Sequence, residues 1–189
     1  MSKMLSGQNV AILTANGFNQ HDLIEAQKAL LAAGAKVKII SPDQGLISGW
    51  DGQGWGHNFP VDQSLATALG ADYDMLVIPG GSRALDKLQT TAHTRRFINN
   101  FMTMAKPVAL FGDAASILVF AEQANGRVVA VAEAAKAVLE TAGATVVDDV
   151  MAMDGNLMSS PVVDGEQRQG LIVQMLDFFA GNAKLAQAA

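Results

Sequence analysis

One stretch near the middle of the chain, residues 106–118, restricts the possible folds more than any other. It reads KPVALFGDAASIL, with an apolar run at 108–111, a tight turn at Gly112 and Asp113, and a helical pattern from Ala114. A buried strand that leads through a turn into a helix is typical of α/β proteins, and such a turn lies at the carboxyl edge of the sheet. The turn therefore predicts the position of a site, although neither of its residues is an obvious nucleophile.

The length and charge of the chain set limits on its class. Its 189 residues are enough for one full-sized domain, so we expect a single domain over residues 1–189. The net charge is −5 and no run of Lys or Arg occurs, which argues against nucleic acid and anionic membranes as partners. We find neither a signal-peptide pattern nor an apolar run of membrane-spanning length, so we expect a cytoplasmic protein.

The chain contains no cysteine. Disulfides, thiolate metal sites and a cysteine nucleophile are therefore excluded. The three histidines, His21, His57 and His93, do not have the spacing of metal ligands. We accordingly expect neither a metal ion nor a cofactor.

The first sixty residues predict a βαβ unit followed by a hairpin. Apolar runs at 9–14 and 36–40 predict strands, with a helix between them that starts near Asn19 or Asp22 and ends at about residue 33. Residues 43–60 then combine recurrent glycine with Trp and Phe, which predicts a projecting β-hairpin. Its two Trp side chains should pack against the parent domain, against a second subunit or, as a third possibility, against a ligand.

A second candidate loop follows the predicted strand at 74–78. It reads Pro79-Gly80-Gly81-Ser82. Two consecutive glycines can turn backbone N–H groups into open space, as an oxyanion site requires, or they can simply form a tight turn into a helix. Ser82 could cap that helix or act as a nucleophile.

The remaining elements follow the same alternation of strand and helix. We expect a helix over 84–105 with a break near 90–91, a helix from residue 114 to about 123, a strand over 127–131, a helix over 133–141, strands over 146–153 and 157–160 joined as a hairpin, a final helix over 164–180, and a frayed tail over 182–189.

This order of elements, together with several local motifs, resembles the ThiJ/PfpI superfamily of class I glutamine amidotransferase-like proteins. The motifs are VIPGG at 77–81, KPVA at 106–109, Gly126-Arg127 before a strand, and DGNL at 154–157 with Ser159-Ser160. The resemblance implies an α/β, flavodoxin-like three-layer sandwich, with a mostly parallel sheet, helices on both faces and a small projecting β-hairpin. It also implies a homodimer or a higher homo-oligomer.

The resemblance further implies where reactive residues would stand. The family's cysteine nucleophile falls at Gly112, its neighbouring histidine at Asp113 and its glutamate at Asn19, so all three positions differ here. Gly80 and Gly81 match the loop whose N–H groups line the oxyanion hole. The string KPVALFGDA is also similar to the C-terminal domain of large-subunit catalases, which carries Gly-Asp-Ala at the same turn and has no known catalysis.

Two hypotheses follow for the function. The first is a pseudoenzyme that acts in binding, assembly or stress-related stabilisation of proteins, in which Asp113 caps the helix after the turn. The second is a divergent intracellular hydrolase, protease-like or amidase-like, or a lyase, that uses Asp113, Asp22 and His21. Either function would place a small-molecule pocket among these residues: Asn19, His21, Asp22, Gly80, Gly81, Ser82, Gly112, Asp113 and Ala114.

Overall fold

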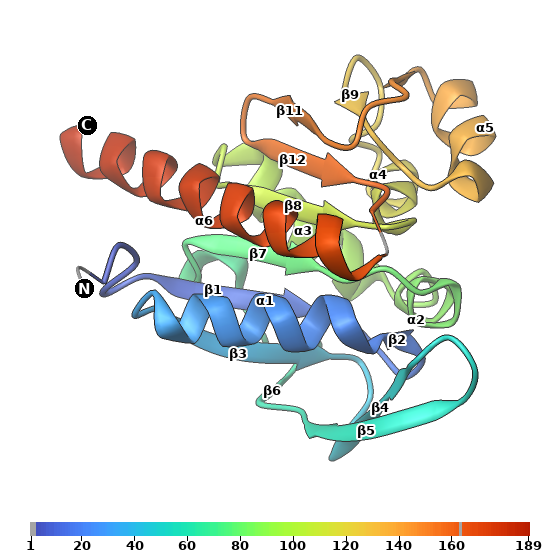
Figure 1. Cartoon of the computed structure of the whole chain (residues 1–189), viewed down its shortest axis with the longest axis horizontal. Helices are drawn as coiled ribbons and strands as arrows, with labels where there is room; N and C mark the ends of the chain where they lie inside the picture. Colours follow the sequence, from blue (N-terminus) through green and yellow to red (C-terminus); the bar gives the residue numbers. More distant parts are fainter. Residues whose placement is uncertain (1–2, 163) are drawn as a thin grey trace.

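A computed structural model describes residues 3–162 and 164–189, and a seven-stranded sheet forms its centre (Figure 1). The order of the strands is β11-β12-β8-β7-β1-β3-β6. Their bounds are β1 Asn9–Leu13, β3 Lys36–Ser41, β6 Gln63–Ser64, β7 Met75–Ile78, β8 Val108–Phe111, β11 Ala152–Asp154 and β12 Leu157–Ser160. Only β11 is antiparallel to its neighbour, so the predicted mostly parallel sheet is confirmed.

Helices cover both faces of this sheet. The helices α1 (Gln20–Ala32) and α6 (Gly165–Ala188) lie side by side on one face, while α3 (Ala92–Thr103) lies on the opposite face (Figure 1). The shorter helices are α2 (Ser82–Leu88), α4 (Ile117–Phe120) and α5 (Glu133–Thr141), with 3₁₀ turns η1 (Gly70–Asp72) and η2 (Ala114–Ser116). Every residue of β7 and β8 is buried. Helices cover both faces of these strands, which explains why their sequences are continuously apolar. The predicted three-layer α/β sandwich is confirmed.

The predicted hairpin is also present, and it packs on its own domain. Strands β4 (Leu46–Trp50) and β5 (Trp55–Pro60) pair antiparallel, and β2 (Phe18–Asn19) joins β4 in parallel to make a separate three-stranded sheet. Gln20 fixes the hairpin to α1, since its buried side chain accepts a hydrogen bond from the His57 N–H at 2.5 Å. The glycines of the hairpin make room for this contact, because a Cβ at Gly56 would overlap the Gln20 amide.

The second half of the chain differs from the prediction in three elements. The strand expected over 127–131 is only β9 (Val128–Val129), which pairs with β10 (Thr145–Val146) outside the central sheet. The strand expected over 146–153 is therefore divided between β10 and β11. The helix after the elbow begins as η2 and ends at Phe120 rather than near residue 123, because Glu122 adopts a positive φ of 59° that stops the helix.

Two helix ends also differ from the sequence patterns. The helix expected from residue 84 begins at Ser82, and its break lies at 89–91, as predicted, where Thr91 caps α3. The tail predicted to fray continues α6 as far as Ala188. Ala183 is buried in this last part of the helix, and its Ala, Lys, Leu and Gln residues have high helix propensity. Among the described residues, no helix is both long and apolar enough to span a membrane.

Candidate functional site

Gly112 forms the elbow between β8 and η2, where the sequence predicted a reactive position. Its φ of +62° lies in the left-handed region, which glycine adopts at little cost. A Cβ placed on Gly112 would meet only the Gly80 Cα, at 3.6 Å. The elbow therefore has space for a side chain, and the chain provides none.

Asp113 does not cap the helix that follows it, so that prediction was wrong. Its backbone has φ −92° and ψ 3°, whereas a side chain that caps a helix needs an extended backbone at that residue. Its Oδ1 instead accepts a hydrogen bond from the Gly81 N–H at 2.8 Å. The carboxylate is therefore directed across the sheet edge to the loop after β7.

Asp22 makes the matching contact at the other glycine of that loop. Its side chain is 3% exposed, and its Oδ2 accepts a hydrogen bond from the Gly80 N–H at 3.0 Å. Its Oδ1 accepts a hydrogen bond from Nη1 of Arg168, a residue of α6 that is equally buried. The two N–H groups predicted to face open space are thus both occupied by carboxylates of the protein itself.

Burial controls the ionisation of Asp22. Removal of the carboxylate from water raises its pKa to about 6, although the Arg168 charge and the Gly80 N–H act in the opposite direction, and the nearby Asp113 raises it a little further. A buried carboxyl group that titrates near neutral pH is more frequent at functional sites than elsewhere, although structural ion pairs also produce such shifts.

Arg168 is the site residue that sequence reasoning missed. Its partner Asp22 lies 146 positions earlier in the chain, so no local pattern connects the two. One signal was nevertheless present, since Arg168 stands three and seven residues before Leu171 and Met175, on the buried face of α6. A charged residue on an apolar helix face requires a buried partner.

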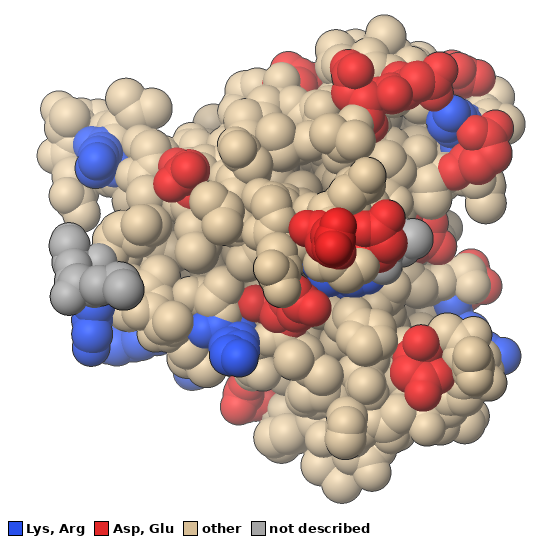
Figure 2. Space-filling model, viewed as in Figure 1, with Lys and Arg blue, Asp and Glu red and all other residues tan. Residues whose placement is uncertain are grey.

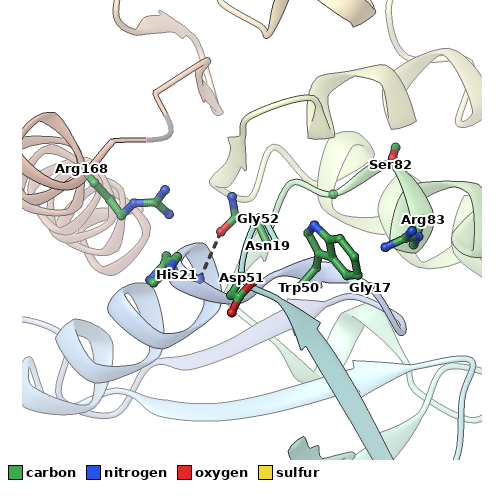
Figure 3. A pocket seen from close by; sticks show the side chains of 10 residues that line it. Gly17, Asn19, His21, Trp50, Asp51, Gly52, Ser82, Arg83 and Arg168 are labelled. Atoms are coloured by element: carbon green, nitrogen blue, oxygen red, sulfur yellow. Dashed lines mark hydrogen bonds between the residues drawn. The ribbon is translucent and has the colours of Figure 1, made fainter. Parts of the chain in front are cut away.

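A cavity of about 530 Å³ opens beside this cluster, between the hairpin and the sheet edge (Figure 3). Its walls come from four places, namely the start of α1, the hairpin, the start of α2 and α6, and the lining residues are Gly17, Asn19, His21, Trp50, Asp51, Gly52, Gly81, Ser82, Arg83 and Arg168. Of the sequence-predicted site residues, Asn19, His21, Gly81 and Ser82 line it. Asp22, Gly80, Gly112, Asp113 and Ala114 are not among the lining residues, and Ala114 is fully buried.

Asn19 caps α1, which was one of the two starts that the sequence allowed. Its Oδ1 accepts hydrogen bonds from the N–H groups of His21 at 3.1 Å and Asp22 at 3.3 Å. An amide whose oxygen accepts must present its nitrogen elsewhere, and Figure 3 shows the Asn19 nitrogen on the side away from the helix. Asn19 thus orders the first turn of α1 and also lines the cavity.

The hairpin supplies an aromatic wall. Trp50 and Trp55 meet edge to face with their ring centroids 5.6 Å apart. The Arg83 guanidinium carbon lies 4.0 Å from the Trp50 ring centroid, which is a cation–π contact between the hairpin and α2. Within the part of the chain that the structure describes, no three His, Asp or Glu side chains are grouped as a metal site requires.

A parallel sheet with a glycine elbow and a Gly-Gly loop at its carboxyl edge defines a flavodoxin-like α/β protein with its site at that edge. The DJ-1/PfpI family model matches residues 8–168, and the chain belongs to the DJ-1/PfpI family. The predicted resemblance to the ThiJ/PfpI superfamily is confirmed.

Curated relatives and solved structures agree with this assignment. The chain is 29% identical to General stress protein 18 of Bacillus subtilis over 84% of this chain and 91% of the relative. It is 31% identical to the deglycase PH1704 of Pyrococcus horikoshii over 81% and 89% of the two chains. The crystal structure of Drosophila melanogaster DJ-1beta has the same fold, with a TM-score of 0.79 at 20% identity, covering 100% of this chain and 97% of that one.

Proposed function

We propose that this protein is a non-catalytic member of the DJ-1/PfpI family that acts by binding a ligand or partner. One observation carries the proposal: the Gly80 and Gly81 N–H groups already donate to Asp22 and Asp113. An oxyanion hole works only when its donors are directed at the position where charge develops on the substrate. With these donors occupied and no cysteine in the chain, the site has neither the nucleophile nor the stabilising donors for thiol chemistry.

The relatives favour a stress-linked role. General stress protein 18 is named for stress, and PH1704 is named a deglycase. A family scaffold with an open cavity and a chemically inert elbow is suited to binding small molecules or to stabilising other proteins under stress. The functional difference from PH1704 would then lie at the elbow and not in the fold.

A panel of amides, peptides and glyoxals, assayed with the purified protein, tests this proposal. We expect no turnover above that of a heat-denatured sample. Clear turnover that disappears in an Asp113→Ala variant would overturn the proposal, because it would show that the elbow carboxylate performs chemistry.

A gain-of-function variant tests the same idea from the opposite direction. Gly112→Cys, Asp113→His and Asn19→Glu together would place the family's residue types at the elbow. The change at Asp113 also frees the Gly81 N–H, and the space above Gly112 admits a Cβ. We expect the triple variant to turn over at least one glyoxal or amide of the panel, and the Gly112→Cys single variant, in which Asp113 still occupies the Gly81 N–H, to be much slower.

A divergent hydrolase or lyase is the second candidate, favoured by the raised pKa of Asp22 next to Asp113. In that case Asp22, which does not line the cavity, would have to become accessible to the substrate to exchange protons with it, and His21 would assist from the wall. Any activity found in the panel should then vary with pH around 6 and be abolished in Asp22→Asn. Activity with a flat pH profile between 5 and 7 would argue against Asp22 as the acid or base.

We also propose that the protein is a homodimer that uses the hairpin. Strand β5 is an exposed edge, and Leu46 and Trp55 on the hairpin are each 59% exposed. The α1 and α6 face is mainly uncharged in Figure 2, with Leu31 and Val173 exposed on it, and it is the alternative contact.

Light scattering coupled to size-exclusion chromatography should give twice the 19.8 kDa chain mass, and Trp55→Ser should shift the measured mass toward that of the monomer. A monomer at micromolar concentration would refute the dimer.

A further inference from the structure

The cavity beside the elbow has several hydrogen-bond donors on its wall. Because the Asn19 Oδ1 is used in capping α1, the part of that side chain left for a ligand is its NH₂ group, and no other residue of the described chain hydrogen-bonds to it. The Ser82 hydroxyl and the His21 imidazole line the same space. The Asn19 NH₂ group needs a ligand that accepts hydrogen bonds, whereas the Ser82 hydroxyl and the His21 imidazole can each donate or accept.

Two guanidinium groups line this cavity, and one of them, that of Arg83, supplies the positive charge available to a ligand. Arg83 stacks on Trp50 and forms no ion pair within the described residues, so its charge is not balanced by a carboxylate. Stacking uses the face of a guanidinium and leaves its N–H edge available for a ligand. Arg168 extends from α6 toward the cavity from the opposite side, where it forms a buried ion pair with Asp22 (Figure 3).

One oxygen of the only carboxylate among the described lining residues, Asp51, is used in the turn of the hairpin. Asp51 Oδ1 accepts hydrogen bonds from the Gln53 and Gly54 N–H groups, both at 2.8 Å, and these close the turn of the hairpin. Both contacts lower the pKa of Asp51, so it remains a charged part of the turn. It neither pairs with Arg83 nor supplies a proton to a ligand.

From this arrangement, and building on the proposed binding function, we propose that the cavity binds a small organic carboxylate whose apolar body faces Trp50. The volume of about 530 Å³ is in the range of metabolite-binding sites. A carboxylate fits better than a phosphate, because phosphate sites in α/β folds rely on backbone N–H groups of glycine loops. Here the loop N–H groups are held by Asp22 and Asp113.

Calorimetry with benzoate and its neutral counterpart benzamide tests the charge requirement on the full-length protein. We expect benzoate to bind with one site per chain and to change the tryptophan emission, and benzamide to bind at least about tenfold more weakly. Inorganic phosphate is the probe for the alternative ligand class. Tighter binding of phosphate than of benzoate would overturn the carboxylate assignment, as would no benzoate binding at about 10 mM.

Two variants test whether the ligand binds in this cavity. Asn19→Asp keeps an oxygen that can cap α1 but replaces the donor NH₂ with an acceptor, and Arg83→Gln removes the unbalanced charge. Each should weaken benzoate at least about tenfold with little change in the unfolding midpoint. Arg95→Gln is the matched control, because Arg95 also stacks on an aromatic ring, Phe120 at 5.1 Å, but does not line the cavity. Equal affinity in all four proteins would overturn the assigned position.

This experiment separates the inference from the proposed function. Proton NMR of benzoate after incubation reports any chemical change of the ligand, and the amide, peptide and glyoxal panel reports turnover. Turnover without loss of benzoate binding would overturn only the non-catalytic function. Absent binding together with absent turnover would overturn only the carboxylate site.

Discussion

Gly81 has the most crowded surroundings of the three glycines Gly80, Gly81 and Gly112 at the sheet edge. A Cβ there would lie 2.7 Å from the Gly17 carbonyl oxygen and 2.9 Å from the Asn19 nitrogen. Both are backbone atoms that cannot rotate away, and the φ of +119° also disfavours any residue with a side chain. The glycine is therefore required for the loop to approach the start of α1 closely enough to form one wall of the cavity.

We expect Gly81→Ala to lower the free energy of unfolding by about 3 kcal/mol or more, because it combines backbone strain with overlap. Urea denaturation measures this loss. Gly52→Ala is the control, since Gly52 has a φ of +106° but no atom within 4 Å of its Cβ position. That variant should lose only about 1 kcal/mol. Equal losses would mean that backbone conformation alone, and not space, makes Gly81 necessary.

The residue scale also shows how much of the site was predictable. The turns at Gly80, Gly81 and Gly112 could be located from the sequence, because each follows a buried strand within its own motif. The role of Asp113 was not predictable, because its partner Gly81 lies 32 positions earlier in the chain. Whether the carboxylate caps the following helix or binds the Gly81 N–H depends on the backbone conformation of Asp113. The cavity itself depends on Arg168 and the hairpin, which meet the elbow only in the folded chain.

Among the elements, the hairpin depends on one side chain of α1. Gln20 is 7% exposed, and its side-chain oxygen accepts a hydrogen bond from the His57 N–H. The hairpin is thus positioned by a polar contact within an otherwise apolar interface. The Phe18 and Phe59 rings, 5.5 Å apart, complete this interface. The position of Trp50 against Arg83, and with it the shape of the cavity, therefore depends on Gln20.

We expect Gln20→Ala to destabilise the hairpin locally by about 1–2 kcal/mol, because it leaves the His57 N–H without a partner. Hydrogen exchange should become faster over residues 46–60, while β7 and β8 keep their protection. Gln27→Ala, in the same helix but without a hydrogen bond to the hairpin, is the control and should change neither region. Unchanged exchange over residues 46–60 in Gln20→Ala would show that the aromatic contacts hold the hairpin alone.

Elements could be predicted where their own residues determine them. The strands β1, β7 and β8 are continuous apolar runs, and they were found at nearly their observed bounds. The two-residue strands β2 and β6 were missed, and β9 and β10 were predicted as longer strands, because so short a strand is defined by its pairing partner and not by its composition. The end of α6 was missed because the burial of Ala183 is a tertiary contact that the local sequence pattern does not show.

At the scale of the whole molecule, the stability should depend on pH through Asp22. Its folded pKa of about 6 lies above its ordinary value of 3.8, so between these values the native state holds a proton that the unfolded state has lost. Stability from this group is therefore complete below pH 4 and is lost as the pH rises through 6. The loss amounts to about 3 kcal/mol at most, at 1.36 kcal/mol for each unit of pKa.

Urea denaturation at pH 4 and pH 7, compared between the wild type and Asp22→Asn, measures this contribution. The other carboxylates are common to both proteins, so the difference between the two profiles isolates Asp22. We expect the wild type to lose stability relative to the variant as the pH rises. A relative gain would mean that the attraction of Arg168 outweighs the cost of burying the carboxylate.

The contact between Asp22 and Arg168 also has a consequence for synthesis on the ribosome. The two residues are 146 positions apart, so α1 and most of the sheet leave the ribosome before the arginine has been translated. Until α6 docks, the Asp22 carboxylate has no partner cation and is more stable in water than in the interior. We therefore expect the α1 face to stay solvated in the nascent chain and to close only when α6 docks on it.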